Sequence, residues 1–246
     1  MNQKSCRFYC YRNSREPNIS KTNRLNKIEL VIFDMDGVLT DTISSWKYIH
    51  EYFGCSNERS VDEYLRGKID DMEFIKRDAT LWKEDGKPIT RDRLVDILSD
   101  IPLMKGAKQS IDALKEKNIY TVIVSAGLDI LAERVAKKLD IDFVFANGIK
   151  TDKNGRLNGE GIVGVGLIYK DRNVIKISNK LNIPLENIVA IGNSCFDIPM
   201  LETSGMGIAF NPEDDCIKKV ADIVVEGKDL SKVISVLKPF MKLFFL

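Results

Sequence analysis

The feature that most constrains the fold is an apolar run that ends abruptly in two acids. Residues 31–40 begin Val-Ile-Phe and continue Asp34-Met35-Asp36-Gly37, so two carboxylates stand two residues apart directly after a hydrophobic segment. A short apolar run bounded by turn residues predicts a buried strand. In open α/β sheets, ligands bind beyond the carboxyl ends of the strands. We therefore expect Asp34 and Asp36 at a binding edge, where two close carboxylates need a cation or a shared proton.

The composition indicates an ordinary globular protein. The chain has 246 residues, enough for one large domain or for a domain with an insertion. Hydrophobic residues make up 44% and charged residues 30%, and no apolar run approaches the roughly 18 residues of a membrane helix. The formal net charge of +1 disfavours nucleic-acid binding by the chain as a whole. The first residues also lack the apolar core of a secretory signal.

The cysteines and the histidine exclude several kinds of site. Five cysteines, an odd number scattered along the chain, argue against a disulfide framework and favour reduced thiols, as in a cytoplasmic protein. The chain contains one histidine, His50. A histidine-based metal site or a Ser-His-Asp triad is therefore disfavoured.

Residues 1–27 differ from the rest of the chain. They contain seven Lys or Arg residues against one acid, Glu16, which is a net charge of +6. We expect this basic arm to be poorly ordered, and an arm that binds an anionic partner is the alternative. Cys6 and Cys10 lack a second pair of ligands, so they support a zinc site only weakly.

The remaining residues divide into a helical segment and an alternating one. Residues 28–33 predict the first strand, and residues 43–100 predict four short helices. Four helices exceed what one crossover between parallel strands needs, so we predict an inserted helical cap; simple crossover helices are the alternative. Strands and helices then alternate, with a hairpin between 147 and 165, which predicts an α/β fold with a doubly wound, mostly parallel sheet. The predicted core comprises residues 28–42 and 101–246.

Chemically capable residues follow several of these strands. Because the carboxyl ends of parallel strands meet at one edge, we expect one crevice with carboxylates, a hydroxyl and an ammonium group. Each residue also has an ordinary alternative: the acids as turn or helix caps, the serine as a turn residue, the lysine as one of several surface lysines. The residues concerned are Asp34, Asp36, Ser125, Ala126, Gly127, Lys170 and the segment 192–197, which reads Gly-Asn-Ser-Cys-Phe-Asp.

This ordered set resembles the signature of the haloacid dehalogenase superfamily. That signature is an Asp-x-Asp pair, a Ser or Thr, a Lys and late acidic residues, each after a strand. The resemblance covers roughly residues 29–230, and its subgroup is similar to phosphoserine-phosphatase-like enzymes, which carry a helical cap after the first strand. The segment Phe145-Ala146-Asn147-Gly148 supports the subgroup.

The resemblance implies a magnesium-dependent phosphomonoester hydrolase. Asp34 would attack phosphorus and form an aspartyl-phosphate, while Asp36 would act first as general acid and then as general base. Lys170 would neutralise charge at the phosphoryl group. The implied metal ligands are Asp34, Asp36 through its backbone carbonyl, Asn193 and Asp197. The implied phosphate and substrate contacts are Ser125, Ala126, Gly127 and, from the cap, Arg77.

Three departures from the family pattern bear on activity and substrate. Asn193 stands where the family usually has Asp, so the metal site loses one negative charge. Ile43 and Phe196 replace a Glu and an Asn of phosphoserine phosphatases, and an apolar pair suits a cationic amino acid poorly. We therefore expect the reaction to be kept on a small phosphorylated metabolite, with phosphoserine itself a hypothesis. A weak or inactive binding or regulatory protein, a phosphotransferase and a homodimer remain open, whereas a membrane partner is not expected.

Overall fold

The computed structural model describes residue 25 and residues 27–241, so the predictions for the basic arm lie almost wholly outside the described residues. A seven-stranded sheet forms the centre, in the order β6-β5-β4-β1-β7-β8-β9. All neighbouring strands are parallel except β6, which runs antiparallel to β5. The predicted doubly wound, mostly parallel sheet is confirmed. The strands are β1 (Leu30–Phe33), β4 (Tyr120–Leu128), β5 (Phe143–Thr151), β6 (Leu157–Ile162), β7 (Ile188–Gly192), β8 (Met206–Phe210) and β9 (Ile223–Val225).

The strand β1 lies in the middle because all four of its side chains are apolar and fully buried. Val31 and Phe33 pack into the hydrophobic cluster on one face of the sheet, and Leu30 and Ile32 into the cluster on the other. This alternation is the two-residue period of a strand covered on both faces. The residues that follow β1 are thereby fixed at the centre of the sheet's carboxyl edge.

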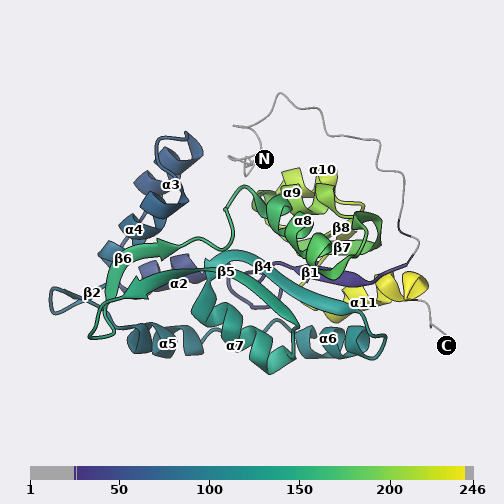
Figure 1. Ribbon diagram of the computed structural model, residues 1–246, viewed down its shortest axis with the longest axis horizontal. Helices are drawn as coiled ribbons and strands as arrows, with labels where there is room; N and C mark the ends of the chain where they lie inside the picture. The colour runs from purple at the N-terminus through teal and green to yellow at the C-terminus, as the bar shows by residue number, and fades with distance from the viewer. Residues whose placement is uncertain (1–24, 26, 242–246) are drawn as a thin grey trace.

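Helices cover both faces of the sheet (Figure 1). The lower face in that view carries α5 (Arg91–Ser99), α6 (Ala107–Lys115) and α7 (Asp129–Leu139), with α11 (Ser231–Leu237) packed against α6. The upper face carries α8 (Lys170–Leu181), α9 (Ile198–Thr203) and α10 (Asp215–Val220). Within the described residues, no helix has both the length and the apolar character needed to cross a lipid bilayer.

The segment between β1 and α6 forms the helices that its periodicity predicts. These are α2 (Ser45–Tyr52), α3 (Glu58–Leu65), α4 (Asp71–Leu81) and α5, with a short hairpin of β2 (Lys83–Glu84) and β3 (Lys87–Pro88) that the sequence did not reveal. Side chains of Ser44, Asp70 and Thr90 accept backbone N–H groups at the helix starts. The helix α4 packs against β6, while α5 packs against α7.

Candidate active site

The turn after β1 presents Asp34 and Asp36. The backbone N–H of Asp34 still bonds Ile191 O of β7 at 2.9 Å, so the sheet fixes this residue. Gly37 then adopts φ +79°, and a Cβ there would lie 1.9 Å from the amide nitrogen of Asn193. Glycine is needed at this position on both counts, because an L residue disfavours the left-handed region and the space is filled. Asp34 and Asp36 are both buried.

Lys170 joins two of the predicted acids. Its Nζ lies 2.9 Å from Asp34 Oδ1 and 2.5 Å from Asp197 Oδ1, and all three side chains are almost completely buried. Lys170 is the first residue of α8, so its side chain reaches back over the carboxyl edge of the sheet. Among the lysines of this helix, the structure therefore places the predicted one beside Asp34. Met35 N also donates to Asp34 Oδ1, at 2.8 Å.

Asp197 holds the loop after β7 in place. Its Oδ2 accepts backbone N–H groups from Asn193 at 2.9 Å and Ser194 at 3.0 Å, while its Oδ1 accepts from Lys170. A Cβ on Gly192 would lie 2.3 Å from the Asp197 Cβ, so a larger residue would displace this carboxylate. Both oxygens of Asp197 already have donors. In this arrangement Asp197 holds the loop after β7 in place and positions the ammonium group of Lys170.

Asp36 is fixed by a residue that sequence reasoning missed. Ser45, the first residue of α2, donates its backbone N–H at 2.7 Å and its hydroxyl at 2.8 Å to Asp36 Oδ2. The Ser45 hydroxyl oxygen in turn accepts Leu128 N at 3.0 Å. Ser44 and Ser45 stand side by side at the start of α2, and which of them meets Asp36 depends on where α2 docks. Asp36 Oδ1 is buried without a hydrogen-bond partner among the described residues.

Ser125, Ala126 and Gly127 lie where the pairing of β4 with β5 shifts register, between Val124 and Leu128. The Ser125 side chain accepts Gly127 N at 3.1 Å, and Trp46 Nε1 donates to Ala126 O at 2.9 Å. A Cβ on Gly127 would lie 2.8 Å from Asp36 Oδ2. The predicted phosphate-binding segment therefore lies directly beside Asp36, at the same edge of the sheet.

Asn193 contacts a second acid that sequence reasoning missed. Its Nδ2 donates to Glu213 Oε1 at 3.0 Å, and the Glu213 backbone N–H donates to Asn193 O at 2.8 Å. Glu213 follows β8, so the rule that selected Asp34 and Asp197 would also have found it. The amide of Asn193 thus donates through nitrogen, which leaves its oxygen as the atom able to bind a cation.

Burial and neighbouring charges shift the pKa values of this cluster. Burial, reinforced by the Asp197 carboxylate and opposed by Lys170, raises the pKa of Asp34 from 3.8 to about 7. Burial also raises the pKa of Asp36, although the two hydrogen bonds from Ser45 oppose the change. Burial alone would lower the pKa of Lys170, but the Asp197 and Asp34 carboxylates outweigh it and hold the pKa above its usual range.

These residues open into a cavity of about 500 Å³. Its lining includes Asp34, Asp36, Ser125, Lys170 and Asn193. Most of the other lining side chains come from the segment between β1 and α5, which contains α2, α3 and α4.

Three further residues singled out in the sequence are Ile43, Phe196 and Arg77, and only the first two line the cavity. Ile43, whose side chain is 65% exposed, and Phe196 both line the cavity, as expected for an apolar pair at its mouth. Arg77 is not among the lining residues. It bonds Glu73 at 2.9 Å and Glu63 at 2.5 Å on the inserted helices.

The fold and this cluster define a class: an α/β protein with a doubly wound, mostly parallel sheet and a buried Asp-Lys-Asp set at the carboxyl edge of that sheet. The model of the haloacid dehalogenase-like hydrolase family matches residues 31–202. The chain therefore belongs to the haloacid dehalogenase-like hydrolase family, and its relatives show that it is phosphoserine-phosphatase-like.

Two relatives and one solved structure illustrate the similarity. The phosphoserine phosphatase of Archaeoglobus fulgidus is 34% identical over 213 residues, which cover 85% of this chain and 60% of that protein. The phosphoserine phosphatase of Methanocaldococcus jannaschii is 29% identical over 228 residues, covering 86% of this chain and 99% of that protein. A structure described as a phospho-aspartyl intermediate analogue of phosphoserine phosphatase superposes with a TM-score of 0.70 at 27% identity, covering 85% and 99% of the two chains.

Proposed function

We propose that the chain is a magnesium-dependent phosphatase that hydrolyses a small phosphomonoester through an aspartyl-phosphate on Asp34. The observation that carries the proposal is the contact of Lys170 with both Asp34 and Asp197, where Lys170, Asp34 and Asp36 line a cavity. The solved structure named for a phospho-aspartyl intermediate supports the same chemistry in a relative. In this proposal residues 43–100 act as the cap over a core of residues 28–42 and 101–246.

The donor set fits a hard cation. Among the described residues, no group of three or more His, Cys, Asp or Glu side chains is placed to hold a metal. The oxygens available here are of mixed kind: the Asp34 carboxylate, the Asp36 backbone carbonyl, the Asn193 amide oxygen and, beside it, Glu213. Magnesium binds such oxygens and keeps several waters. When bound, it supplies positive charge that neutralises the phosphoryl oxygens.

The two acids have distinct tasks. An Asp34 oxygen forms a bond to phosphorus while the ester O–P bond breaks, and protonated Asp36 gives its proton to the departing alkoxide. Water then attacks the aspartyl-phosphate and gives a proton back to Asp36, which releases inorganic phosphate and restores the Asp34 carboxylate. The raised pKa of Asp36 suits the acid in the first step. Lys170 and the N–H groups after Ser125 hold the phosphoryl oxygens.

The test is phosphate release from p-nitrophenyl phosphate and a panel of phosphorylated metabolites, with magnesium and with EDTA. We expect turnover only with the metal, and acid-quenched enzyme should carry a hydroxylamine-sensitive phosphoryl group on Asp34 by mass spectrometry. Asp34→Asn should abolish both signals. Turnover that survives Asp34→Asn, or a phosphoryl group found on another residue, would contradict the mechanism.

One observation favours a second candidate, a weak or inactive binding protein. Asn193 brings no charge to the metal site, and a magnesium ion there would lose one anionic ligand. The contact of Asn193 with Glu213 places a carboxylate at the same point, which favours an active enzyme. Phosphate release that is absent at high magnesium, together with retained phosphoester binding, would select the binding protein.

A further inference from the structure

The part of the cavity lined by the helices between β1 and α5 contains a second cluster, built around His50. This buried imidazole contacts three other side chains: its Nδ1 lies 3.3 Å from Cys55 Sγ and accepts Trp82 Nε1 at 3.1 Å, and its Nε2 lies 3.2 Å from Asp78 Oδ2. Asn57 Nδ2 donates to the same Asp78 oxygen at 2.9 Å. His50, Cys55, Asn57 and Asp78 all line the cavity.

The contact with Trp82 fixes the protonation of His50. An indole N–H can only donate, so the Nδ1 of His50 must be the acceptor. A neutral imidazole then carries its proton on Nε2, which lies 3.2 Å from Asp78 Oδ2 without forming a hydrogen bond. The donor to the Asp78 carboxylate is Asn57 Nδ2, a neutral group.

This cysteine, histidine and aspartate do not form a nucleophilic triad. The Nδ1 lone pair that would take the thiol proton already accepts the Trp82 N–H. Burial and the nearby Asp78 carboxylate both raise the pKa of Cys55, whereas a nucleophilic cysteine needs a lowered one. The cluster is better suited to binding than to covalent chemistry.

One carboxylate oxygen of Asp78 has no hydrogen-bond donor among the described residues. The Asp78 side chain is 3% exposed, and the oxygen concerned, Oδ1, is buried. A buried carboxylate oxygen without a donor is unfavourable. An O–H or N–H group of a bound ligand would satisfy it.

The charged side chains that line the cavity also favour a ligand with donor groups. Four acids of the inserted helices line the cavity: Glu51, Glu58, Asp71 and Asp78. Only two cations line it among the described residues. Lys47 Nζ lies 3.6 Å from Glu51 Oε1, and Lys170 is paired with Asp34 and Asp197.

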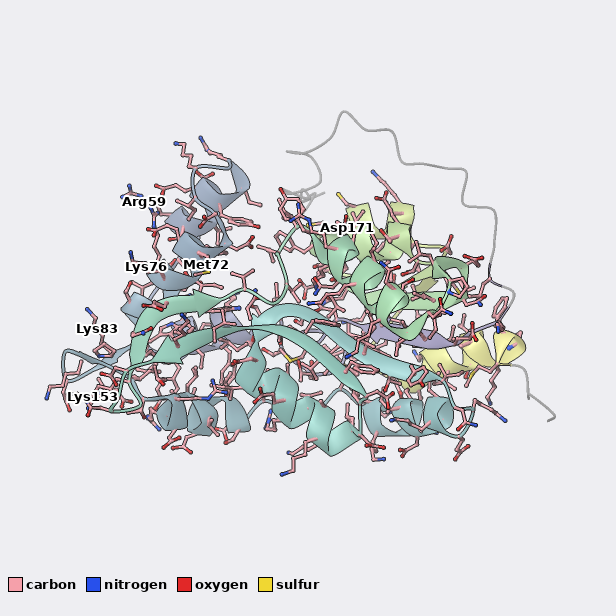
Figure 2. The ribbon with its side chains drawn as sticks, viewed as in Figure 1. Arg59, Met72, Lys76, Lys83, Lys153 and Asp171 are labelled. Atoms are coloured by element: carbon pink, nitrogen blue, oxygen red, sulfur yellow. The ribbon has the colours of Figure 1, made fainter. Side chains whose placement is uncertain are left out.

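The other basic side chains of the inserted helices lie elsewhere. Arg59 of α3 and Lys76 of α4, like Lys83 of the hairpin strand β2, extend away from the rest of the molecule (Figure 2). Arg77 is paired with Glu63 and Glu73. Among the described residues, a carboxylate on the leaving group would meet acids here and no unpaired arginine or lysine.

We infer that the part of the cavity lined by His50 and Asp78 is the leaving-group subsite and that it selects alcohols bearing a hydroxyl or ammonium donor and no carboxylate. The inference rests on the proposed function, because the subsite discriminates only among phosphoesters that reach Asp34. It sets this chain apart from relatives named for phosphoserine, whose leaving group carries a carboxylate. Asp78 is the specificity-determining residue, and His50 and Asn57 hold it in position.

The test uses substrate pairs that differ in the carboxylate. O-Phosphoethanolamine is compared with O-phosphoserine, and glycerol 3-phosphate with 3-phosphoglycerate, by kcat/KM. In both pairs we expect the member without the carboxylate to be preferred by at least about tenfold, since a buried unpaired anion is strongly rejected. Comparing phosphoethanolamine with glycerol 3-phosphate then shows whether the subsite prefers an ammonium or a hydroxyl donor. Equal rates within both pairs, or preference for the acids, would overturn the inference.

Asp78→Asn keeps the size of the side chain and removes its charge. We expect it to reduce the preference within each pair about tenfold or more, mainly through KM, while p-nitrophenyl phosphate turnover reports the chemistry at Asp34. Asp62→Asn, on the exposed side of α3, removes the same charge outside the cavity and should leave the preference unchanged. An unchanged preference in Asp78→Asn would assign the discrimination elsewhere and contradict the role of this residue.

A binding measurement separates this inference from the proposed function. Asp34→Asn protein is titrated with phosphoethanolamine and with phosphoserine, followed by thermal shift. Tighter binding of phosphoethanolamine supports the subsite even if no phosphoester is turned over. If the enzyme turns over p-nitrophenyl phosphate but shows equal kcat/KM within both substrate pairs, the proposed phosphatase function is supported and the subsite is rejected.

Discussion

Lys170 Nζ lies 2.9 Å from Asp34 Oδ1, and neither side chain is more than 8% exposed. A buried charge is stable only when it is paired, and removing one partner leaves the other charge buried without compensation. Lys170 therefore both neutralises the cluster and holds the carboxylate that the proposed reaction uses. Its second contact, to Asp197, ties the same ammonium group to the loop after β7.

Replacing Lys170 with Met should affect activity and stability together. Loss of a charge that stabilises the phosphoryl group should lower kcat by about 10² to 10³. Two buried carboxylates would lose their cation, which should lower the free energy of unfolding by about 3–5 kcal/mol in metal-free protein. The measurements are phosphate release and urea unfolding in EDTA.

Lys176→Met is the matched control for this variant. Lys176 lies on the same helix, with its Nζ 5.3 Å from the centre of the Phe145 ring, and takes no part in the cluster. We expect changes in stability within about 0.5 kcal/mol and unaltered kcat. Similar losses in both variants would mean that the helix, rather than the Asp34 contact, accounts for the effect.

The stability of metal-free protein should depend on pH through Asp34. Its pKa is raised from 3.8 to about 7 in the fold, so between those values the folded chain binds more protons than the unfolded chain. The free energy of unfolding should therefore fall as pH rises through this window, by at most on the order of 4 kcal/mol from this group. Unfolding in EDTA from pH 4 to 8 tests this, and Asp34→Asn should lack that part of the slope.

Much of this cluster could be predicted from the sequence, because strand-end position alone selects residues. Asp34, Ser125, Lys170 and Asp197 follow or face the carboxyl ends of parallel strands, and the sheet brings them together. What the sequence could not supply was the docking of the inserted helices. Ser45 reaches Asp36 only because α2 packs over the end of β4.

The placement of Arg77 depends on the same docking. The sequence predicts Arg77 as a substrate contact by residue type; in the structure it pairs with Glu63 and Glu73, whereas Asp78, the next residue, lines the cavity. A helix turns 100° per residue, so one position decides whether a side chain lines a cavity. Without the contacts of α4, no spacing rule distinguishes the two. The hairpin of β2 and β3 was missed because each strand has only two residues.

Asn193→Asp should lower the magnesium concentration for half-maximal activity by restoring an anionic ligand. The new carboxylate would also face Glu213, whose Oε1 lies 3.0 Å from Asn193 Nδ2 in the structure. Without metal the two like charges should lower the melting temperature. Magnesium titrations of activity and thermal unfolding in EDTA are the two measurements.

A double variant tests whether Glu213 is the source of that repulsion. Asn193→Asp combined with Glu213→Gln should recover the metal-free melting temperature, because an amide can donate to the new carboxylate. Glu213→Gln alone should raise the magnesium requirement, since it removes a charge beside the metal ligands. An unchanged requirement in Asn193→Asp, or no recovery in the double variant, would show that the two positions do not share a cation.

Ser45→Ala should lower kcat while KM changes little. The variant keeps the backbone N–H that bonds Asp36 but removes the hydroxyl, which donates to Asp36 Oδ2 at 2.8 Å and accepts Leu128 N. Asp36 would then be held less firmly, and its already raised pKa should rise further because a hydrogen bond to the charged form is lost. We expect a fall in kcat of about 10- to 100-fold, with the basic pKa of the pH–rate profile displaced upward.

Ser44→Ala provides the comparison, because Ser44 is the neighbouring serine and caps α2 through Lys47 N. It should cost about 1 kcal/mol in stability, as helix-cap removal generally does, with a much smaller change in kcat. If Ser44→Ala and Ser45→Ala lower kcat equally and leave the pH–rate profile in place, the serine acts through the position of α2. A displaced profile in Ser45→Ala alone assigns the effect to the proton held on Asp36.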